Sequence, residues 1–324
     1  MTDPSNNNPP ASSLPESPES PAQGSVGRRA RKAQRAAAPR KTGRVRRAVG
    51  WLLIVAAVVT AGRWGWDTFG TTWWIQKDQH KELDSFALTL PSAPSEYGQL
   101  HTDFVKYPPP DMDLASVATG DPFGLLTIPR WQGQEGVYGE TLYNKILIKQ
   151  GAKTQSGNTA ILNTAAAAHY IDTADPGQIG NFAISAHRRS YGDNFLRLNE
   201  LEKGDFAVVE TAGAWYVYQV LDHSIVLPSE TYVINPDPYA PVDSDGTQQP
   251  TRRLITMTTC TLPNGSPWGN TRRWIVHGEL YGWMEREAGV PPQIEEYWDA
   301  PNPTETKACN ASEDCPDPVS STLG

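Results

Sequence analysis

The sequence predicts a β-rich domain of seven or eight strands, preceded by a single membrane-spanning helix. Three observations predict it. Short apolar runs separated by turn residues fill the central part of the chain, as in closed antiparallel barrels and sandwiches. One apolar segment near the N-terminus carries no charge and is long enough to cross a bilayer. Both ends of the chain are polar and proline-rich, which is typical of segments without a packed core.

The strand-like runs are seven to thirteen residues long, rich in β-branched and aromatic side chains, and separated by Gly, Pro, Asn or Asp. They are 124–130, 143–151, 181–188, 205–213, 215–227, 253–260 and 272–283. Strands at this spacing predict a closed barrel or a sandwich. One or two short helices fit between them, over 163–171 and around 194–201.

The apolar segment predicts a membrane anchor with its N-terminus in the cytoplasm. Residues 48–62 are uncharged, and the span extends over 48–66 if Arg63 snorkels and two tryptophans lie at the interface. Ten Lys or Arg residues lie between positions 28 and 47, and such clusters stay on the cytoplasmic side. A cleaved signal peptide, with a site near 59–61, is the alternative. In both cases the rest of the chain is exported.

Composition divides the chain around this span. We expect a disordered basic tail over 1–47, an extracellular linker over 67–117, a folded domain over 118–288 and a proline-rich acidic tail over 289–324. After position 47 the chain holds 18 basic and 33 acidic residues, a net charge of −15. A body of this charge is a poor partner for nucleic acid.

The three cysteines separate by context. Cys309 and Cys315 lie close together in the polar tail, where an exported protein can join them in a small disulfide loop. A zinc site is the alternative, but this pair lacks the second pair of ligands that a closed tetrahedral site needs. Cys260 stands apart at the end of a strand-like run. No metal or cofactor is predicted.

The residue types that thiol chemistry needs occur, like Cys260, at the ends or starts of strand-like runs. A nucleophilic cysteine needs a basic or cationic neighbour, and acyl transfer needs a donor for the developing oxyanion. His187 ends one strand-like run, and Arg272 and Arg273 begin another. Spacing alone leaves simpler interpretations open: a buried apolar cysteine, a capping histidine and solvated edge charges.

Three motifs in this order resemble the sortase family. The segment NFAISAHRRSYGDNFLRLNELEKGD (181–205) is similar to the family's histidine motif. LITMTTC (254–260) resembles its cysteine signature, and RRWIVHGEL (272–280) resembles the arginine strand that follows. The match spans 124–283, and the sequence after the histidine resembles the class E branch of high-GC Gram-positive bacteria.

The resemblance implies a sortase-type eight-stranded β-barrel and a cysteine transpeptidase. Such an enzyme cleaves an LPxTG-like or LAxTG-like sorting signal of an exported protein between Thr and Gly. It transfers the product to an amine of the wall precursor lipid II or to a pilin lysine. Cys260 would be the nucleophile, His187 the proton donor and acceptor, and Arg273 the oxyanion donor. Tyr191 and Thr259 would contact the substrate.

Strand alternation selects between the two arginines. Successive side chains of a strand point to opposite faces, so only one of Arg272 and Arg273 can face the cysteine. The family's arginine strand fits with Arg273 first. Two other functions stay open on the residues alone: a hydrolase with the same cysteine and water as acceptor, and a wall-binding module without catalysis.

Overall fold

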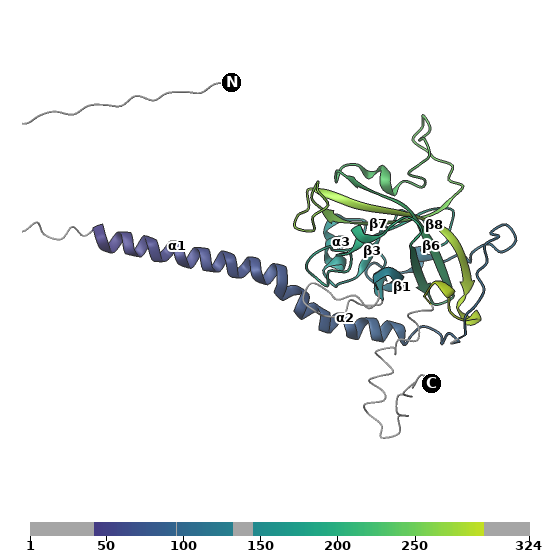
Figure 1. Ribbon diagram of the computed structural model, residues 1–324, viewed down its shortest axis with the longest axis horizontal. Helices are drawn as coiled ribbons and strands as arrows, with labels where there is room; N and C mark the ends of the chain where they lie inside the picture. Colours follow the sequence, from purple (N-terminus) through teal and green to yellow (C-terminus); the bar gives the residue numbers. More distant parts are fainter. Residues whose placement is uncertain (1–41, 95, 132–144, 295–324) are drawn as a thin grey trace, which may run out of the picture. The chain divides into compact units, whose positions relative to one another are not determined.

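A computed structural model describes residues 42–94, 96–131 and 145–294 (Figure 1). Within these ranges it contains three α-helices: α1 (Thr42–Gly65), α2 (Thr71–Ala87) and α3 (Gln155–Leu162). A π-helical turn (Trp66–Gly70) joins α1 to α2. Thr154 caps the N-terminus of α3, because its hydroxyl accepts a hydrogen bond from the backbone N–H of Gly157 at 3.2 Å. The predicted disulfide between Cys309 and Cys315 lies outside the described residues.

Eight strands form a closed barrel, which confirms the predicted fold class. They are β1 (Pro122–Thr127), β2 (Ile146–Lys149), β3 (Ala167–His169), β4 (Gly180–Ser185), β5 (Phe206–Thr211), β6 (Ala214–Val226), β7 (Arg253–Thr261) and β8 (Arg272–Glu285). Their order around the barrel is β1-β2-β3-β4-β7-β8-β6-β5. The pairs β2–β3 and β4–β7 are parallel and the others are antiparallel.

The two faces of β7 have different surroundings. Ile255 and Met257 belong to the core cluster inside the barrel, so alternation directs Thr256, Thr258 and Cys260 to the outer face. The segment between β6 and β7 covers part of that face, and Thr256 and Thr258 are buried there. Cys260, one step farther along the strand, is half-buried. The outer face of β7 thus opens toward solvent at its last residues.

The predicted helix over 163–171 is wrong, because α3 ends before it begins. After Asn163 the backbone enters a left-handed turn at Ala165, with φ of 57°. The alanines that follow form β3, and Ala167 pairs with Ile148 of β2 in parallel register. Ala167 is fully buried, so tertiary packing overrides the helix preference of alanine. Of the second predicted helix only a single 3₁₀ turn, Leu198–Glu200, is present.

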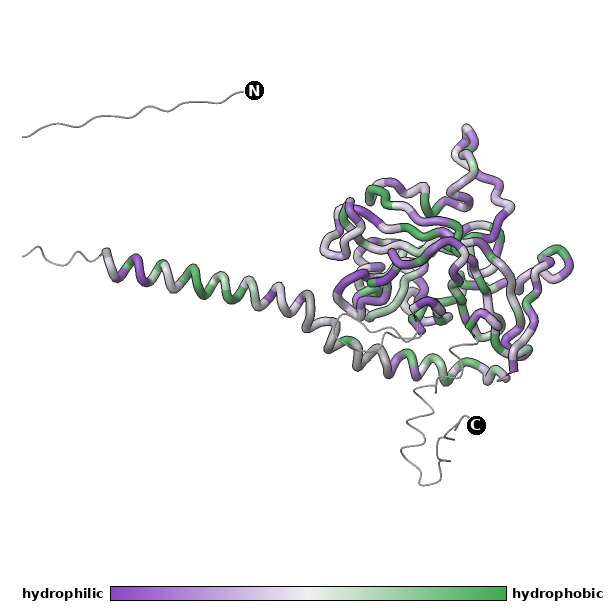
Figure 2. The backbone as a smooth tube through the Cα atoms, viewed as in Figure 1, coloured by the Kyte–Doolittle hydropathy of each residue, from purple (hydrophilic) through white to green (hydrophobic). Residues whose placement is uncertain are grey.

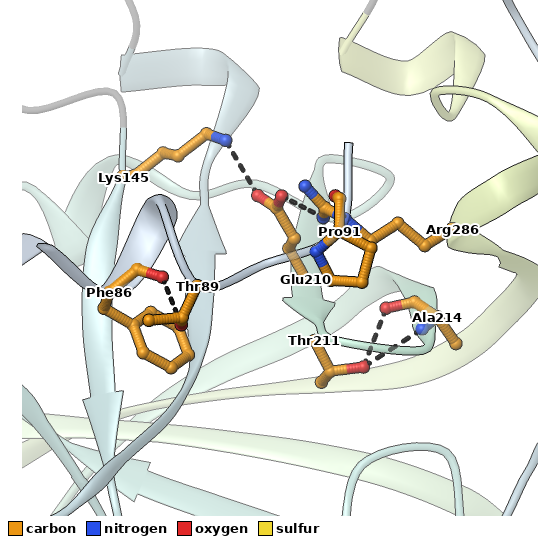
Figure 3. A network of polar contacts seen from close by, with 8 residues as sticks. All are labelled: Phe86, Thr89, Pro91, Lys145, Glu210, Thr211, Ala214 and Arg286. Atoms are coloured by element: carbon orange, nitrogen blue, oxygen red, sulfur yellow. Dashed lines mark hydrogen bonds and ion pairs between the residues drawn. The ribbon is translucent and has the colours of Figure 1, made fainter. Parts of the chain in front are cut away.

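Part of the predicted linker packs against the barrel. Leu90 joins a small apolar cluster with β1 and β2 side chains, and Leu83 and Phe86 of α2 pack against it. Glu82 of α2 forms an ion pair with Lys149 of β2, and its carboxylate lies 2.6 Å from the lysine Nζ. The chain leaves α2 through Thr89, whose hydroxyl donates to the carbonyl of Phe86 at 2.6 Å (Figure 3).

A buried ion pair holds the same linker at the far end of β5. Glu210 is fully buried and accepts a hydrogen bond from Arg286, which follows β8. Arg286 also donates from Nε to the carbonyl oxygen of Pro91 in the linker (Figure 3). Lys145 Nζ completes the cluster at 2.8 Å from Glu210 Oε2. Because each charge has a partner, the desolvation of this buried cluster is compensated.

Helix α1 has the length and composition of a membrane span. Among the described residues, only the stretch Gly43–Gly65 forms a helix long and apolar enough to cross a bilayer. Its large apolar side chains, Trp51 and Leu52 among them, are exposed, and Figure 2 shows the middle of the helix as hydrophobic. A helix of this length whose apolar side chains are exposed is consistent with a membrane anchor.

Candidate active site

The histidine and the cysteine lie level with each other on two paired strands. β4 and β7 are parallel, and Ser185 pairs with Thr258. Two residues farther along both strands, His187 comes level with Cys260, on the same outer face. The pairing continues that far, because the backbone N–H of Ala186 donates to the carbonyl of Thr258 at 3.3 Å. The barrel wall therefore positions the two side chains next to each other.

Thr259, on the inner face of β7, also links β7 to the residue before His187. It is 3% exposed, and its hydroxyl donates to the carbonyl oxygen of Ala186 at 2.8 Å. That contact fixes the backbone just before His187. Alternation points Thr259 away from the face that carries Cys260, and its predicted contact with substrate stays a prediction.

The arginine that faces Cys260 is Arg273. In the antiparallel pair β7–β8, Cys260 is directly opposite Arg273, and Thr261 is opposite Arg272. Directly opposed residues place their side chains on the same face of a sheet. Arg273 Nη1 donates to the carbonyl oxygens of Asn270 and Arg272 at 2.9 and 3.0 Å. Arg272 shares the face of Thr261, as strand alternation predicts.

Asn163 and Tyr191 orient the His187 ring. The ring Nε2 lies 2.8 Å from Asn163 Oδ1, and an amide oxygen only accepts hydrogen bonds, so this contact places a proton on Nε2. Tyr191 stacks on the ring at a centroid distance of 5.4 Å. Burial lowers the pKa of His187 below its ordinary value. The imidazole is thus held neutral at neutral pH, with Nδ1 as its basic atom.

The loop after His187 has a strained backbone. Ser190, Tyr191 and Asp193 have φ of 68°, 50° and 53°, and Gly192 between them has φ of 95°. Residues other than glycine rarely adopt this left-handed backbone conformation, because it costs about 1–3 kcal/mol for each residue. The loop closes where the N–H of Phe195 donates to the carbonyl of His187 at 3.0 Å. The strain is retained beside the histidine, as is common at functional sites.

Comparison with known proteins decides the family. Residues 138–281 match the family model described as Sortase domain. Sortase SrtE2 of Streptomyces coelicolor is 34% identical over 142 residues, which are 42% of this chain and 50% of the relative. Sortase SrtE1 of the same organism is 30% identical over 185 residues, 55% of this chain and 46% of the relative. The SrtA sortase from Actinomyces oris is 37% identical over 60% of this chain and 96% of the solved chain, with a TM-score of 0.50. The chain belongs to the sortase family.

The family membership gives the chemistry its general form. As a family, sortases are generally cysteine transpeptidases that act on sorting signals of exported proteins. Both curated relatives are SrtE sortases, in agreement with the resemblance to class E. The matched regions span about half the length of these two relatives. In this sortase, the described residues contain no group of three His, Cys, Asp or Glu side chains that could hold a metal ion.

Tyr170 belongs to the same face, although sequence patterns did not indicate it. It follows β3, and its backbone N–H donates to the carbonyl of Ala183 in β4 at 2.9 Å. Burial raises the pKa of its phenol, and a hydrogen bond with Ser185 and the charge of Arg273 partly oppose that rise. Tyr170 thus lies within electrostatic range of both Arg273 and Cys260.

Asn163 was also missed, since the sequence analysis placed it at the start of a predicted helix over 163–171. Its role depends on the turn at Ala165, which directs the end of α3 toward the histidine. Asn194 fixes that turn by donating to the carbonyl of Ala165 at 2.6 Å. The signal available in sequence was weak: an asparagine followed by a threonine after a helical pattern.

Proposed function

We propose that this sortase cleaves an LPxTG-like or LAxTG-like sorting signal between Thr and Gly and transfers the Thr acyl group to an amine. The observation that carries the proposal is the shared strand level of three side chains on one barrel face. In the sheet, Cys260 is opposite Arg273 of β8, and continuing the β4–β7 register two residues past Ser185 brings it level with His187, just after β4. This is a nucleophile, a proton carrier and an anion-stabilising donor in one row.

In the first half-reaction the proton of the Cys260 thiol passes to Nδ1 of His187, the resulting thiolate attacks the Thr carbonyl carbon, and the carbonyl oxygen gains negative charge. Arg273 stabilises that oxyanion with its guanidinium N–H donors. When the C–N bond breaks, the Gly amine leaves with a proton from the protonated form of His187, and a thioester remains on Cys260.

In the second half-reaction an incoming amine attacks the thioester carbonyl and gives its proton to His187. The C–S bond breaks, a new amide forms, and the Cys260 thiolate is regenerated. We propose that the acceptor is an amine of lipid II or a pilin lysine. With α1 in the membrane and its basic N-terminal flank in the cytoplasm, the barrel would meet these partners outside the cell.

The test is a product analysis on the full chain in detergent. LAxTG and LPxTG peptides are incubated with and without a glycine-amine acceptor, and the products are identified by mass. The proposal predicts cleavage between Thr and Gly and an amide product when the acceptor is present. If only the free acid forms at every acceptor concentration, the protein is a hydrolase. Absence of any cleavage of both peptides contradicts the proposed signal class.

A further inference from the structure

Three buried polar side chains form a network under the segment that joins β6 to β7. They are Asn181 of β4, Thr256 of β7 and His277 of β8, with exposed fractions of 1%, 0% and 4%. His277 Nδ1 lies 2.9 Å from the Thr256 hydroxyl oxygen, which lies 2.8 Å from Asn181 Oδ1. The Asn181 amide nitrogen donates to the carbonyl oxygens of Val233 and Asn235 at 3.2 and 3.0 Å. This polar network therefore connects three barrel strands to the backbone of the segment.

Hydrogen-bond chemistry fixes the direction of each bond in the polar network. Backbone carbonyls only accept, so the amide nitrogen of Asn181 faces them and its oxygen faces Thr256. The Thr256 hydroxyl donates its one hydrogen to Asn181 Oδ1 or to the carbonyl of Val233, which is 3.2 Å away. His277 must then donate from Nδ1. Because every bond depends on the next, removing one member leaves buried polar atoms without partners.

The segment that the polar network holds lies beside the row formed by Cys260 and Arg273. It begins with the 3₁₀ turn Thr231–Ile234. Val233 of this turn packs with Val226 and Ile275 in one buried cluster. Val226 is directly opposite Arg273, and Ile275 lies two residues farther along β8 on the same face. The turn therefore borders the row on the side of β8 and β6.

The sorting signal would extend toward this turn when it reacts at Cys260. In the proposed first half-reaction the Gly amine leaves with a proton from His187, so the peptide after the scissile bond lies on the β4 side. The residues before the scissile Thr then extend to the other side of β7, where β8 and β6 follow in the barrel. A wall that is already fixed there orients the peptide before the reaction begins.

We infer that Asn181, Thr256 and His277 are positioning residues, which hold the turn Thr231–Ile234 as the wall against which the sorting signal binds. All three are buried, so they act on the peptide through the turn and do not touch the reacting atoms. The inference rests on the proposed function, since it takes a sorting-signal peptide to Cys260. The competing explanation is that the polar network only stabilises the folded barrel.

The experiment compares Thr256→Val with the wild type as the full chain in detergent, with LAxTG and LPxTG peptides and a saturating glycine-amine acceptor. Valine keeps the shape of threonine and removes the hydroxyl that joins His277 to Asn181. We expect the KM for the peptide to rise about tenfold and kcat to stay within about threefold of the wild type, because binding is lost and the reacting groups are not moved. The KM for the acceptor amine and the rate at which iodoacetamide alkylates Cys260 should not change. Thr256→Ser, which keeps the hydroxyl, should restore most of the peptide KM.

Thr127→Val is the matched control, because it makes the same change in β1, on another part of the barrel. Thr127 is 2% exposed, and among the described residues its hydroxyl has no hydrogen-bond partner. This variant should keep the wild-type KM for the peptide. Unfolding midpoints of all variants separate a loss of stability from a loss of binding.

A second measurement keeps the test decisive if Thr256→Val does not fold. Cys260→Ala is mixed with the peptide, calorimetry records binding, and hydrogen exchange is followed at the backbone amides of 231–235. Bound peptide should slow exchange in this turn, because it covers the wall. Binding without any change of exchange in the turn would overturn the inference.

The inference is also overturned if Thr256→Val folds and keeps the wild-type KM for the peptide, with or without a lower unfolding midpoint. The same holds if Thr127→Val raises that KM as much as Thr256→Val does. Failure of the proposed function looks different and is visible before any variant of the polar network is made: the wild type cleaves neither peptide, or Cys260→Ala still processes them.

Discussion

At the scale of single residues, the two adjacent arginines of β8 give a sharp comparison. Arg273 is opposite Cys260, whereas Arg272 is opposite the fully buried Thr261. Removing a donor that meets the oxyanion should lower kcat by about 10²-fold. We therefore expect Arg273→Ala to lose at least that much turnover, and Arg272→Ala to stay within about twofold of the wild type.

Arg273→Lys serves as a further control, because lysine keeps the charge and loses the paired planar donors. It should recover only part of the activity. Rates on one sorting-signal peptide, together with unfolding midpoints for all three variants, settle the comparison. If Arg272→Ala is the inactive variant, the assignment of the two arginines to opposite faces is wrong.

The candidate residues were predictable where a motif and strand alternation agreed. Cys260, His187 and Arg273 each lie at the end or start of a strand, so the sequence indicated which face each side chain takes. The contact of Asn163 with His187 was not predictable, because it joins side chains that are distant in sequence. Thr259 was predicted to contact substrate, which stays a prediction; its position in β7 places the side chain on the inner face, where it bonds to the carbonyl of Ala186.

At the scale of elements, β3 contains a buried histidine that should make folding sensitive to acid. His169 is 1% exposed and lies between Phe123 and Phe182, at centroid distances of 5.9 and 5.1 Å. Burial lowers its pKa from 6.5 to about 4. The unfolded chain therefore binds a proton at higher pH than the folded chain does. The stability that this group contributes is fully present above about pH 6.5 and is lost as the pH falls toward 4.

The loss attributable to His169 amounts to about 3 kcal/mol over that range. Urea unfolding of the barrel in the full chain, followed by tryptophan fluorescence at several pH values, measures this loss. His169→Gln should be less stable at pH 7 but show a flatter pH dependence. His223→Gln, which changes an exposed histidine of β6, is the control. A wild-type slope in His169→Gln would contradict this account.

Element boundaries show what local patterns can and cannot predict. The long apolar runs gave the strands β6, β7 and β8 close to their observed limits, because alternation persists over nine or more residues. The three-residue strand β3 was missed. Its alanine run favours a helix locally, and only pairing with β2 and β4 makes it a strand.

At the scale of the whole molecule, the buried pair Glu210–Arg286 connects the linker to the barrel. Glu210→Gln leaves the Arg286 charge without its carboxylate, although the shape is unchanged. Breaking a buried pair from one side typically costs about 3–5 kcal/mol, so we expect the free energy of unfolding to fall by about that amount. The bond from Arg286 to Pro91 should weaken with it, which exposes the linker to protease.

Glu202→Gln is the matched control for that variant. Glu202 pairs with Arg130 at 3.3 Å, but its side chain is 74% exposed, and exposed pairs contribute about 0–1 kcal/mol. Urea unfolding and limited proteolysis of both variants make the comparison. Equal losses of stability in the two variants would mean that the buried cluster does not hold the linker.

The general architecture followed from composition, while the packing of the linker did not. A charge-free run of apolar residues predicts a span by length alone, and α1 has that length. The contacts of Leu90 and Pro91 with the barrel could not be seen in sequence, because a proline-rich segment reads as extended whether or not it packs. The ion pair that holds it joins residues 76 positions apart.

The most direct test of the central claim is the intact mass of the protein during turnover. The full chain in detergent is mixed with excess LAxTG or LPxTG peptide without an amine acceptor and quenched in acid, and its intact mass is measured by mass spectrometry. Cys260→Ala is treated in the same way. We predict an adduct with the mass of the peptide up to its Thr, joined to Cys260 as a thioester, released by added amine and absent from the variant. An adduct at another residue, or peptide processing that persists in Cys260→Ala, would contradict the account.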